Sequence, residues 1–374
     1  MHAEIAGAGF AGLTAAIALH RCGWTVRVHE KDTELRAFGA GIFIWENGLR
    51  VLHAIGAYEG VVRGAHQAPA YETRRNGVCV ASEKVNGDHR YRLLTMTRQH
   101  LYAGILASAH REGIEILTNS EVVGALPEGV LQLADGRRLS ADLVIAADGV
   151  RSPVRDSLGL ACTRQKYLDG IIRVLVPRGN FVGGDWDHVI DFWALEPRIL
   201  RTIYAPCEDG QLYFAMMSPR EDMAAATLPV DPAIWASCFP SLTPAFETIG
   251  SRGRYDVYEM ARLDSWSVGR VAIVGDSAHA MPPTLAQGAG CAMMNALSLA
   301  EFVSEASDVV MRLRQWEAQE RSLTDHTQAR AAELVQTRAL SGGMQWDDVG
   351  LRAALHVPTG TRPAEFAQLR HTYI

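Results

Sequence analysis

Cysteine is scarce in this sequence of 374 residues, and its positions form no pattern. The cysteines include no C-x-x-C pair and no spacing typical of metal ligands. A long chain with so few cysteines is typical of a protein kept reduced in the cytoplasm rather than of a disulfide scaffold. We therefore expect a cytoplasmic protein with no metal site. Its free thiols are expected at Cys22, Cys79, Cys162, Cys207, Cys238 and Cys291.

Long apolar runs and an excess of positive charge are absent as well. No apolar stretch reaches the roughly 18 residues that a membrane-spanning helix needs, and no basic segment followed by an apolar run indicates a signal peptide. The formal net charge is −6, which argues against a nucleic-acid-binding surface. The sequence does contain 48% hydrophobic and 21% charged residues, enough for a sizeable core in about two or three domains.

The chain begins with the pattern of a strand–helix–strand unit. Residues 2–6 are apolar like a buried strand, a helix is expected to end at Arg21, and residues 24–30 alternate like a second strand. A unit of this length is typical of a βαβ motif. Residues 32–47 are rich in glycine and polar residues and predict a long loop.

Three glycines follow the first expected strand in the pattern G-x-G-x-x-G. Gly7 permits the tight turn, Gly9 lets the backbone approach a pyrophosphate, and Gly12 allows close packing of the helix against the strand. The helix, with Ala11 in its first turn, offers free N–H groups and the positive end of its dipole to phosphate groups. Because strand, glycines and helix occur in the required order, the pattern predicts a dinucleotide site rather than a mere glycine turn.

An acidic residue ends the second expected strand. Glu30 stands where a carboxylate can accept hydrogen bonds from an adenosine ribose. It favours a free 2′-hydroxyl and repels a 2′-phosphate, so the site suits FAD or NAD rather than NADP. We expect Glu30 and the adjacent Lys31 to contact the cofactor.

Composition changes in the middle of the chain. Aromatic and β-branched runs separated by turns fill residues 165–260 and predict a mainly antiparallel sheet. Strand and helix patterns flank this region, so we expect an α/β (α+β) fold: a discontinuous Rossmann-like domain, an inserted sheet domain and C-terminal helices. The expected boundaries are 1–70, 96–165 and 262–345 for the nucleotide-binding domain, 71–95 and 166–261 for the substrate-binding sheet domain, and 346–374 for a tail.

Two acidic residues follow later apolar strands. Asp148 begins the segment D-G-V-R-S-P-V-R, and Asp276 lies in G-D-S-A-H. A loop rich in proline and glycine follows at residues 281–290. Taken singly, an aspartate after a strand is as easily a helix N-cap as a cofactor ligand.

Together and in this order, these motifs resemble those of the flavoprotein aromatic hydroxylases, the family that includes p-hydroxybenzoate and salicylate hydroxylases. The resemblance extends to about residue 340. It implies bound FAD, transient binding of NADH or NADPH, and transfer of one oxygen atom from O₂ to a small aromatic acid. It is compatible with a homo-oligomer and implies neither a nucleic-acid nor a membrane partner.

The resemblance also assigns cofactor contacts. Asp276 matches the acid that binds the ribityl chain of FAD, and Arg98 matches the arginine that closes over the flavin nucleotide. Residues 288–290 match the start of a helix directed at the flavin, whose positive end stabilises the anionic reduced ring. The expected cofactor contacts are Gly7, Gly9, Ala11, Gly12, Glu30, Lys31, Arg36, Arg98, Val122, Asp148, Asp276, Gly288, Ala289 and Gly290.

Three segments show a further resemblance, to the 2-methyl-3-hydroxypyridine-5-carboxylic acid oxygenases within this family. They are residues 34–42, 263–266 and 286–293. This resemblance implies a 3-hydroxypyridine carboxylate as substrate, with opening of the ring after hydroxylation. The alternatives are a hydroxylase of salicylate or 6-hydroxynicotinate, a flavin dehydrogenase that inserts no oxygen, and a non-catalytic FAD-binding module.

Polar residues within the expected sheet are the candidates for substrate recognition. Arg201 and Arg173 lie in apolar runs, where a buried arginine needs an anion partner, and a substrate carboxylate would match its planar fork. Tyr213 and Tyr71 could bond that carboxylate or a ring hydroxyl. The alternatives are arginines that face solvent on alternating strands and tyrosines that pack in the core.

A proline in the loop after Asp276 completes the expected site. Pro283 matches the proline whose carbonyl faces the substrate near the flavin. We expect catalysis at Pro283, Arg201 and Tyr213, within a substrate pocket that Tyr71 and Arg173 complete. For His279 we expect a structural role, and without a G-x-S-x-G elbow the sequence does not predict a Ser/His/Asp hydrolase.

Overall fold

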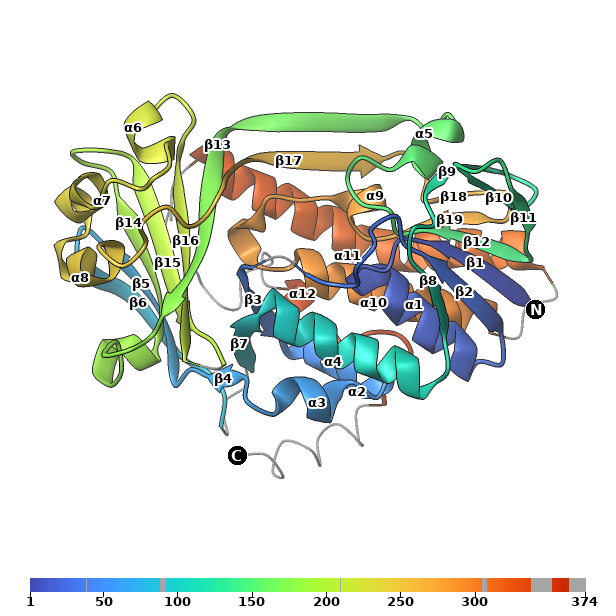
Figure 1. Ribbon diagram of the computed structural model, residues 1–374, viewed down its shortest axis with the longest axis horizontal. Coiled ribbons are helices and arrows are strands. Elements are labelled where there is room, and N and C mark those ends of the chain that lie inside the picture. The colour runs from blue at the N-terminus through green and yellow to red at the C-terminus, as the bar shows by residue number, and fades with distance from the viewer. Residues whose placement is uncertain (38, 88–91, 209, 305–307, 338–351, 363–374) are drawn as a thin grey trace.

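The computed structural model describes all residues except 38, 88–91, 209, 305–307, 338–351 and 363–374, and contains two large sheets (Figure 1). The first sheet has the order β18-β19-β12-β1-β2-β8, with all neighbours parallel except β18 and β19. Because β18 and β19 come from late in the chain, this sheet joins segments on both sides of the middle region. Its strands are β1 His2–Ala6, β2 Thr25–His29, β8 Glu115–Leu117, β12 Leu143–Ala146, β18 Ser267–Val268 and β19 Val271–Ile273.

Burial explains why the first sheet is parallel. Strand β12 is buried at every residue and β1 at all but its first, as expected for parallel strands covered on both faces. Leu13 and Ile17 of the first helix are fully buried in the same core, and each such side chain stabilises the fold by about 2 kcal/mol. The main helices are α1 Phe10–Arg21, α4 Arg98–Arg111, α10 Gly288–Val303 and α11 Val309–Thr337.

The second sheet has seven strands in the order β17-β13-β16-β15-β14-β5-β6. All neighbouring pairs are antiparallel except β14 and β5, so the mainly antiparallel sheet predicted for the middle region is confirmed. Its strands are β5 Ala70–Arg75, β6 Val78–Lys84, β13 Cys162–Pro177, β14 Val189–Ala194, β15 Leu200–Pro206, β16 Gln211–Pro219 and β17 Tyr255–Leu263.

The two faces of the second sheet have different neighbours. Alternate residues such as Ile172 and Phe214 pack in a core with α7 Pro232–Cys238 and α8 Thr243–Phe246, which lie outside the sheet beside α6 Met223–Ala226 (Figure 1). The residues between them, such as Ile171, belong to a second core on the opposite face. Strand periodicity therefore brings Arg173, Arg201 and Tyr213 onto that inner face.

Strands β13 and β17 connect the two halves of the molecule (Figure 1). They pair from Cys162 and Leu263 at one end to Ile172 and Tyr255 at the other, with an irregularity between. The expected boundaries at residues 165 and 261 fall inside these strands, and the boundary at 95 falls inside strand β7, Leu93–Thr97. The division into two domains stays a proposal, because the paired strands β13 and β17 run without a break across the expected boundaries.

One expected loop contains regular structure. Strand β3, Gly41–Trp45, is buried at every residue and pairs with β7, Leu93–Thr97, which also pairs with β4, His66–Gln67. The expectation of a loop throughout residues 32–47 is therefore wrong, because the apolar run G-I-F-I-W forms a strand despite its glycine-rich surroundings. Two helices follow, α2 Glu46–Ala54 and α3 Tyr58–Val62.

The remaining elements are short. The hairpin expected around Asp135 and Gly136 is confirmed, because β10 and β11 pair on either side of them. Parts of the expected tail, and the last residues of the expected C-terminal helices, lie outside the described residues. Among the helices that the structure describes, none is long and apolar enough to cross a membrane. The short elements are β9 Val122–Leu126, β10 Val130–Leu133, β11 Arg138–Ser140, α5 Pro153–Ser157, α9 Asp276–His279 and α12 Arg352–Leu355.

The close contact between Gly12 of α1 and the turn at Gly7 predicts that a side chain at residue 12 destabilises the fold. A Cβ atom on Gly12 would lie 2.0 Å from the carbonyl oxygen of Gly7. Gly12→Ala therefore forces backbone apart, and we expect the free energy of unfolding to fall by about 3 kcal/mol, measured by thermal unfolding without cofactor. Gly9→Ala is the matched control, because a Cβ there meets no atom within 4 Å. Equal losses of stability in the two variants would contradict the steric argument.

Candidate active site

Two neighbouring cavities lie between the first βα turn and the inner face of the second sheet. The nucleotide cavity, of about 700 Å³, is lined by Glu30, Arg36 and other residues near the first turn. The inner cavity, of about 360 Å³, reaches the second sheet. The two cavities share the lining residues Gly9, Phe10, Gly41, Arg98, Arg173 and Asp276. An elongated ligand could therefore extend from one into the other.

Helix N-termini meet both cavities without a side-chain cap. Helix α1 begins after Gly9 and α10 begins at Gly288, and neither N-cap residue makes a side-chain capping hydrogen bond. A Cβ on either glycine would meet no atom within 4 Å, so backbone is open to a ligand at both places. Free N–H groups and the positive helix end favour a phosphate or an anionic ring edge there.

Glu30 is held at the rim of the nucleotide cavity. One carboxylate oxygen accepts a hydrogen bond from the backbone N–H of Ala8 at 3.0 Å, and the other accepts one from the N–H of Asp32 at 3.1 Å. These bonds orient the carboxylate at the end of β2. Its remaining lone pairs are placed to accept hydrogen bonds from ribose hydroxyls.

Asp276 faces the cavities with its hydrogen-bonding capacity unused. It lines both of them, and its carboxylate makes no hydrogen bond within the part of the chain that the structure describes. Its position deep in the protein raises the pKa of the carboxyl, and the charges of Arg98 and Arg173 partly offset this rise. A carboxylate left open to a cavity needs a ligand with hydroxyl donors, and the ribityl chain of FAD has them.

Arg98 lies opposite Asp276 at the start of α4. Its guanidinium is 5.0 Å from the centre of the Phe10 ring, and its backbone N–H donates to the carbonyl of Ala40 at 2.7 Å. Burial lowers the pKa of Arg98, and the negative charge of Asp276 opposes this effect. The arginine thus places a positive charge where the cavities meet, so the residues present fit FAD.

Several expected cofactor contacts lie elsewhere. Lys31 is exposed and Val122 is buried in β9, and neither belongs to the described lining of either cavity. The carboxylate of Asp148 accepts hydrogen bonds from the N–H of Val154 at 3.2 Å and from Ser277 Oγ at 3.0 Å. Asp148 therefore satisfies an N–H group in the first turn of α5, whose N-cap residue is Ser152.

The glycines of the expected set divide into two groups. Gly9 and Gly288 line a cavity, whereas Gly7, Gly12 and Gly290 lie behind the wall. A Cβ on Gly290 would lie 3.0 Å from Gln287 Oε1, which accepts a hydrogen bond from the Asn47 side chain at 3.0 Å. These three glycines permit close packing that shapes the site rather than lining the cavities themselves.

The five expected substrate residues come together in the inner cavity. Apolar side chains fill the wall between them, which excludes water from the space above the N-terminus of α10. A Cβ on Gly41 would lie 2.3 Å from the Tyr213 ring, so this glycine admits the tyrosine to the wall. The expected residues that line the cavity are Tyr71, Arg173, Arg201, Tyr213 and Pro283, among Ile42, Phe43, Trp45, Ile171, Ile203, Ala215, Met217, Met281 and Leu285.

Arg201 already has an anion partner within the protein. Its Nε and Nη2 atoms donate to the two carboxylate oxygens of Asp191 at 2.8 and 2.9 Å, and its guanidinium lies 4.5 Å from the centre of the Trp193 ring. The argument that burial of Arg201 requires a substrate carboxylate therefore fails. The sequence contained a sign of this pair, because Asp191 is an acid within the apolar run of residues 189–194.

Tyr258 is a second residue that the sequence did not identify. It is buried, and its hydroxyl has no hydrogen-bond partner among the described residues. Burial raises its pKa, while the charges of Arg201 and Arg173 oppose the rise. The alternation of polar and apolar residues in β17 could have indicated an inward tyrosine, but only the pairing of β17 with β13 places it near Arg201.

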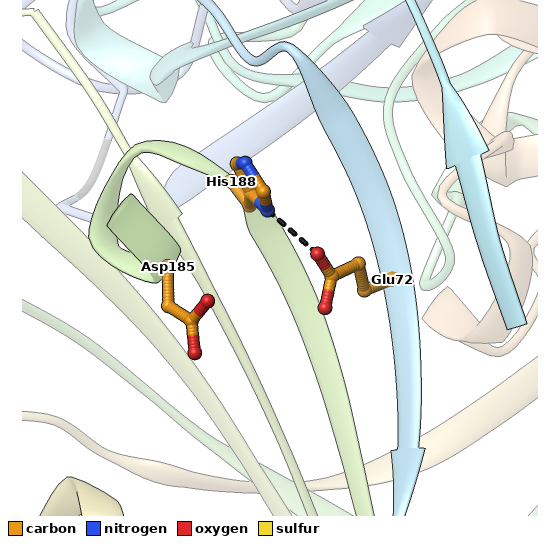
Figure 2. A group of neighbouring side chains, drawn as sticks. All are labelled: Glu72, Asp185 and His188. Atoms are coloured by element: carbon orange, nitrogen blue, oxygen red, sulfur yellow. Dashed lines mark hydrogen bonds and ion pairs between the residues drawn. The ribbon is translucent and has the colours of Figure 1, made fainter. Parts of the chain in front are cut away.

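A cluster of acids and a histidine lies outside the described cavity walls, on β5 and in the turn before β14 (Figure 2). Ligand atoms of Glu72, Asp185 and His188 lie within 4.8 Å of one another, and His188 Nδ1 is 2.7 Å from Glu72. Arg74 pairs with Glu72 at 2.7 Å and with Asp185 at 2.6 Å. A guanidinium therefore already balances both acids, and we interpret the cluster as structural.

Comparisons with known proteins agree with this geometry. The family profile described as FAD binding domain matches residues 1–308. The 2-heptyl-3-hydroxy-4(1H)-quinolone synthase of Mycobacteroides abscessus is 41% identical over 84% of this chain and 85% of its own. The 6-hydroxynicotinate 3-monooxygenase of Bordetella bronchiseptica is 25% identical over 80% and 82%. A solved structure of the tetrameric form of 2-methyl-3-hydroxypyridine-5-carboxylic acid oxygenase matches with a TM-score of 0.91 and 46% identity, over 96% of this chain and 98% of its own.

His279 lies behind the site. It is 2% exposed, and its Nε2 atom accepts a hydrogen bond at 3.0 Å from the side chain of Asn295. Its ring centre lies 5.3 Å from that of Trp266. Burial lowers the pKa of His279 to about 4, so the neutral ring suits the structural role that the sequence predicted.

The lowered pKa of His279 predicts a loss of stability in mild acid. The unfolded chain takes up a proton near pH 6.5, whereas the folded protein does so only near pH 4. Folding stability should therefore fall by about 3 kcal/mol as the pH decreases through this interval, measured by denaturant unfolding at several pH values. The His279→Gln variant should lose this part of the dependence. An unchanged pH slope in that variant would contradict the assignment.

Proposed function

This chain belongs to the FAD-binding flavoprotein aromatic hydroxylases, and from that premise we propose that it hydroxylates an N-heteroaromatic ring that carries a hydroxyl or oxo group. The observation that carries the proposal is the inner cavity, where arginine and tyrosine side chains project from an apolar wall opposite the N-terminus of α10. The first candidates are 3-hydroxypyridine carboxylates, with opening of the ring after hydroxylation. The full-length similarity to the pyridine-ring oxygenase supports them.

The cofactor residues have separate roles in this proposal. When bound, FAD takes two electrons from NADH or NADPH and delivers one atom of O₂ to the ring while the other leaves as water. Glu30 orients the ribose, Asp276 accepts hydrogen bonds from the ribityl hydroxyls, and Arg98 balances negative charge between the two cavities. The first turn of α10, at Gly288, offers N–H groups to the flavin ring edge.

The protein's own contribution is to orient the ring and exclude water. Burial raises the pKa values of Tyr71, Tyr213 and Tyr258, so each phenol stays protonated. Tyr213 lines the inner cavity and can donate a hydrogen bond to a ring oxygen. The Tyr71 hydroxyl donates to Asp191, and Tyr258 does not belong to the described wall of this cavity. Pro283 begins the 3₁₀ turn Pro283–Leu285, which closes the cavity beside the N-terminus of α10. Oxygen transfer to an electron-rich ring needs no separate acid–base pair here, because the ring hydroxyl supplies the electron density.

A second candidate substrate is a 2-alkyl-4(1H)-quinolone. A relative named as a 2-heptyl-3-hydroxy-4(1H)-quinolone synthase supports it, and so does a small cavity of about 40 Å³ beyond Arg201. This small cavity shares Arg201, Met217 and Thr284 with the inner cavity, so an alkyl chain could extend into it. Its other apolar walls are Trp193, Ile199, Leu200, Pro219, Leu334 and Val335.

We also propose a homo-oligomer. The printed description of the similar pyridine-ring oxygenase structure as a tetrameric form supports this proposal.

The proposed role of Asp276 predicts a loss of cofactor affinity without a loss of fold. Asp276→Ala removes an acceptor that no described residue uses, so we expect FAD to bind about ten- to a hundredfold more weakly. Flavin absorbance per protein and titration of the apoprotein measure the change, and thermal unfolding of the apoprotein checks the fold. Asp135→Ala, in an exposed hairpin, is the control. Wild-type FAD affinity in Asp276→Ala would refute the assignment.

The proposed reaction is tested by substrate-stimulated NADH and NADPH oxidation under ¹⁸O₂. We expect one ¹⁸O atom in the product of a ring among 2-methyl-3-hydroxypyridine-5-carboxylate, 5-hydroxynicotinate and 2-heptyl-4(1H)-quinolone. Loss of ring absorbance would indicate ring opening, and an intact hydroxylated pyridine would rule it out. Labelling of salicylate or 6-hydroxynicotinate alone would remove the substrate assignment. Oxidation of NADH without label would indicate a flavin dehydrogenase, and no stimulation at all would favour a binding module.

A further inference from the structure

Asp191 forms a buried ion pair with Arg201 and is not accessible from the inner cavity. Asp191 lies on β14 and Arg201 on the neighbouring strand β15, offset by two residues, since Trp193 is the residue opposite Arg201 and Ile203 is the residue opposite Asp191. The side chain of Asp191 is 0% exposed and that of Arg201 is 11% exposed. Arg201 lines the inner cavity, whereas Asp191 does not belong to its described wall. A substrate can therefore contact the arginine but not the acid that holds it.

Tyr71 completes the cluster around the pair. Nε and Nη2 of Arg201 donate to Asp191, so Nη1 is the nitrogen that takes no part in this bidentate contact. The Tyr71 hydroxyl donates to an oxygen of Asp191 at 3.5 Å and also interacts with Arg201. Arg201 therefore lines the inner cavity with a guanidinium whose positive charge is already compensated.

The other two arginines of the wall also have carboxylates of the protein near them, but without a bidentate contact. Arg173 lies 3.4 Å from Asp256, and the charge of Arg98 acts on Asp276. Each of the three arginines along the described wall thus has a carboxylate of the protein near it. A substrate carboxylate at Arg201 would place a second negative charge on a guanidinium already neutralised, inside an apolar enclosure, and such a charge is costly to desolvate.

We propose that Asp191 is a positioning residue that determines specificity: by neutralising Arg201 it selects rings whose recognised oxygen is an uncharged hydroxyl or carbonyl, and it disfavours carboxylates. This inference rests on the proposed hydroxylation of an N-heteroaromatic ring and narrows its substrate class. Of the two candidate classes, a 4(1H)-quinolone meets this requirement and a 3-hydroxypyridine carboxylate does not, so the inference favours the second candidate over the first. Asp191 acts through Arg201 and touches neither the ring nor the cofactor.

The test compares substrates that differ only in charge. 5-Hydroxynicotinate and 5-hydroxynicotinamide form one matched pair, and 4(1H)-quinolone-2-carboxylate and its primary amide form another. For the pair whose ring the enzyme hydroxylates, we expect the wild-type kcat/KM to be about tenfold higher for the amide than for the acid. A wild-type preference for the acid of tenfold or more would overturn the proposal without any variant.

The variant Asp191→Asn keeps the shape of the pair and removes its negative charge. The acid-to-amide ratio of kcat/KM should then rise by about tenfold or more, mainly through KM, because Arg201 regains an uncompensated charge. Equal losses for acid and amide would show a merely structural role and defeat the proposal. If Asp191→Asn does not fold, the wild-type comparison still decides.

The matched control is Asp185→Asn, in the turn before β14 (Figure 2). It removes an acid from an arginine, Arg74, at 2.6 Å, but Asp185 lines neither described cavity, so the acid-to-amide ratio should stay at the wild-type value. Failure to hydroxylate any ring of the panel would count against the proposed function itself. A hydroxylated ring whose ratio does not respond to Asp191→Asn would defeat only this inference.

Discussion

The close approach of helix α1 to the first strand is the constraint on which the site depends. Gly7 and Gly12 can touch only because neither has a side chain, and Gly7 also packs against the carbonyl of Ala147 at the end of β12. This contact fixes where α1 begins, and so fixes where the open backbone at Gly9 faces the cavities. The acid at Glu30 and the carboxylate of Asp276 are placed by strands of the same sheet, so a nucleotide site follows from one packing arrangement.

The second sheet forms the wall of the inner cavity, and its residues alternate between the two faces of the sheet. Its outer residues pack against short helices, and its inner residues form an apolar surface that carries a few polar groups. Because β13 and β17 run continuously between the two halves, this wall is held rigidly opposite the N-terminus of α10. Pre-organised placement of the ring relative to the flavin is what such an enzyme must provide, since the cofactor carries the chemistry.

Charge compensation is the third feature of the site. An arginine buried in an apolar wall is stable only with an anion beside it, and Asp191 supplies that anion for Arg201 before any substrate arrives. The raised pKa values of the surrounding tyrosines keep their phenols neutral. On the proposed function, the inner cavity would recognise a ring through hydrogen bonds with little net charge rather than as a carboxylate receptor.

The sequence by itself determined the parts of this protein that depend on local pattern. The glycine motif, the first βα unit, the hairpin at Asp135 and the alternation of the middle strands are readable because backbone conformation and strand periodicity involve neighbouring residues. The order of the motifs along the chain predicted the family and its cofactor, FAD. Only the tertiary structure decided which polar residues meet. It paired Arg201 with Asp191 and placed Tyr258 on the same small cavity as Arg201. It also joined Asp148 to Val154 and Ser277 while it left Asp276 facing the cavities. Those outcomes depend on strand pairing and register between segments far apart in the chain, and no local pattern encodes them.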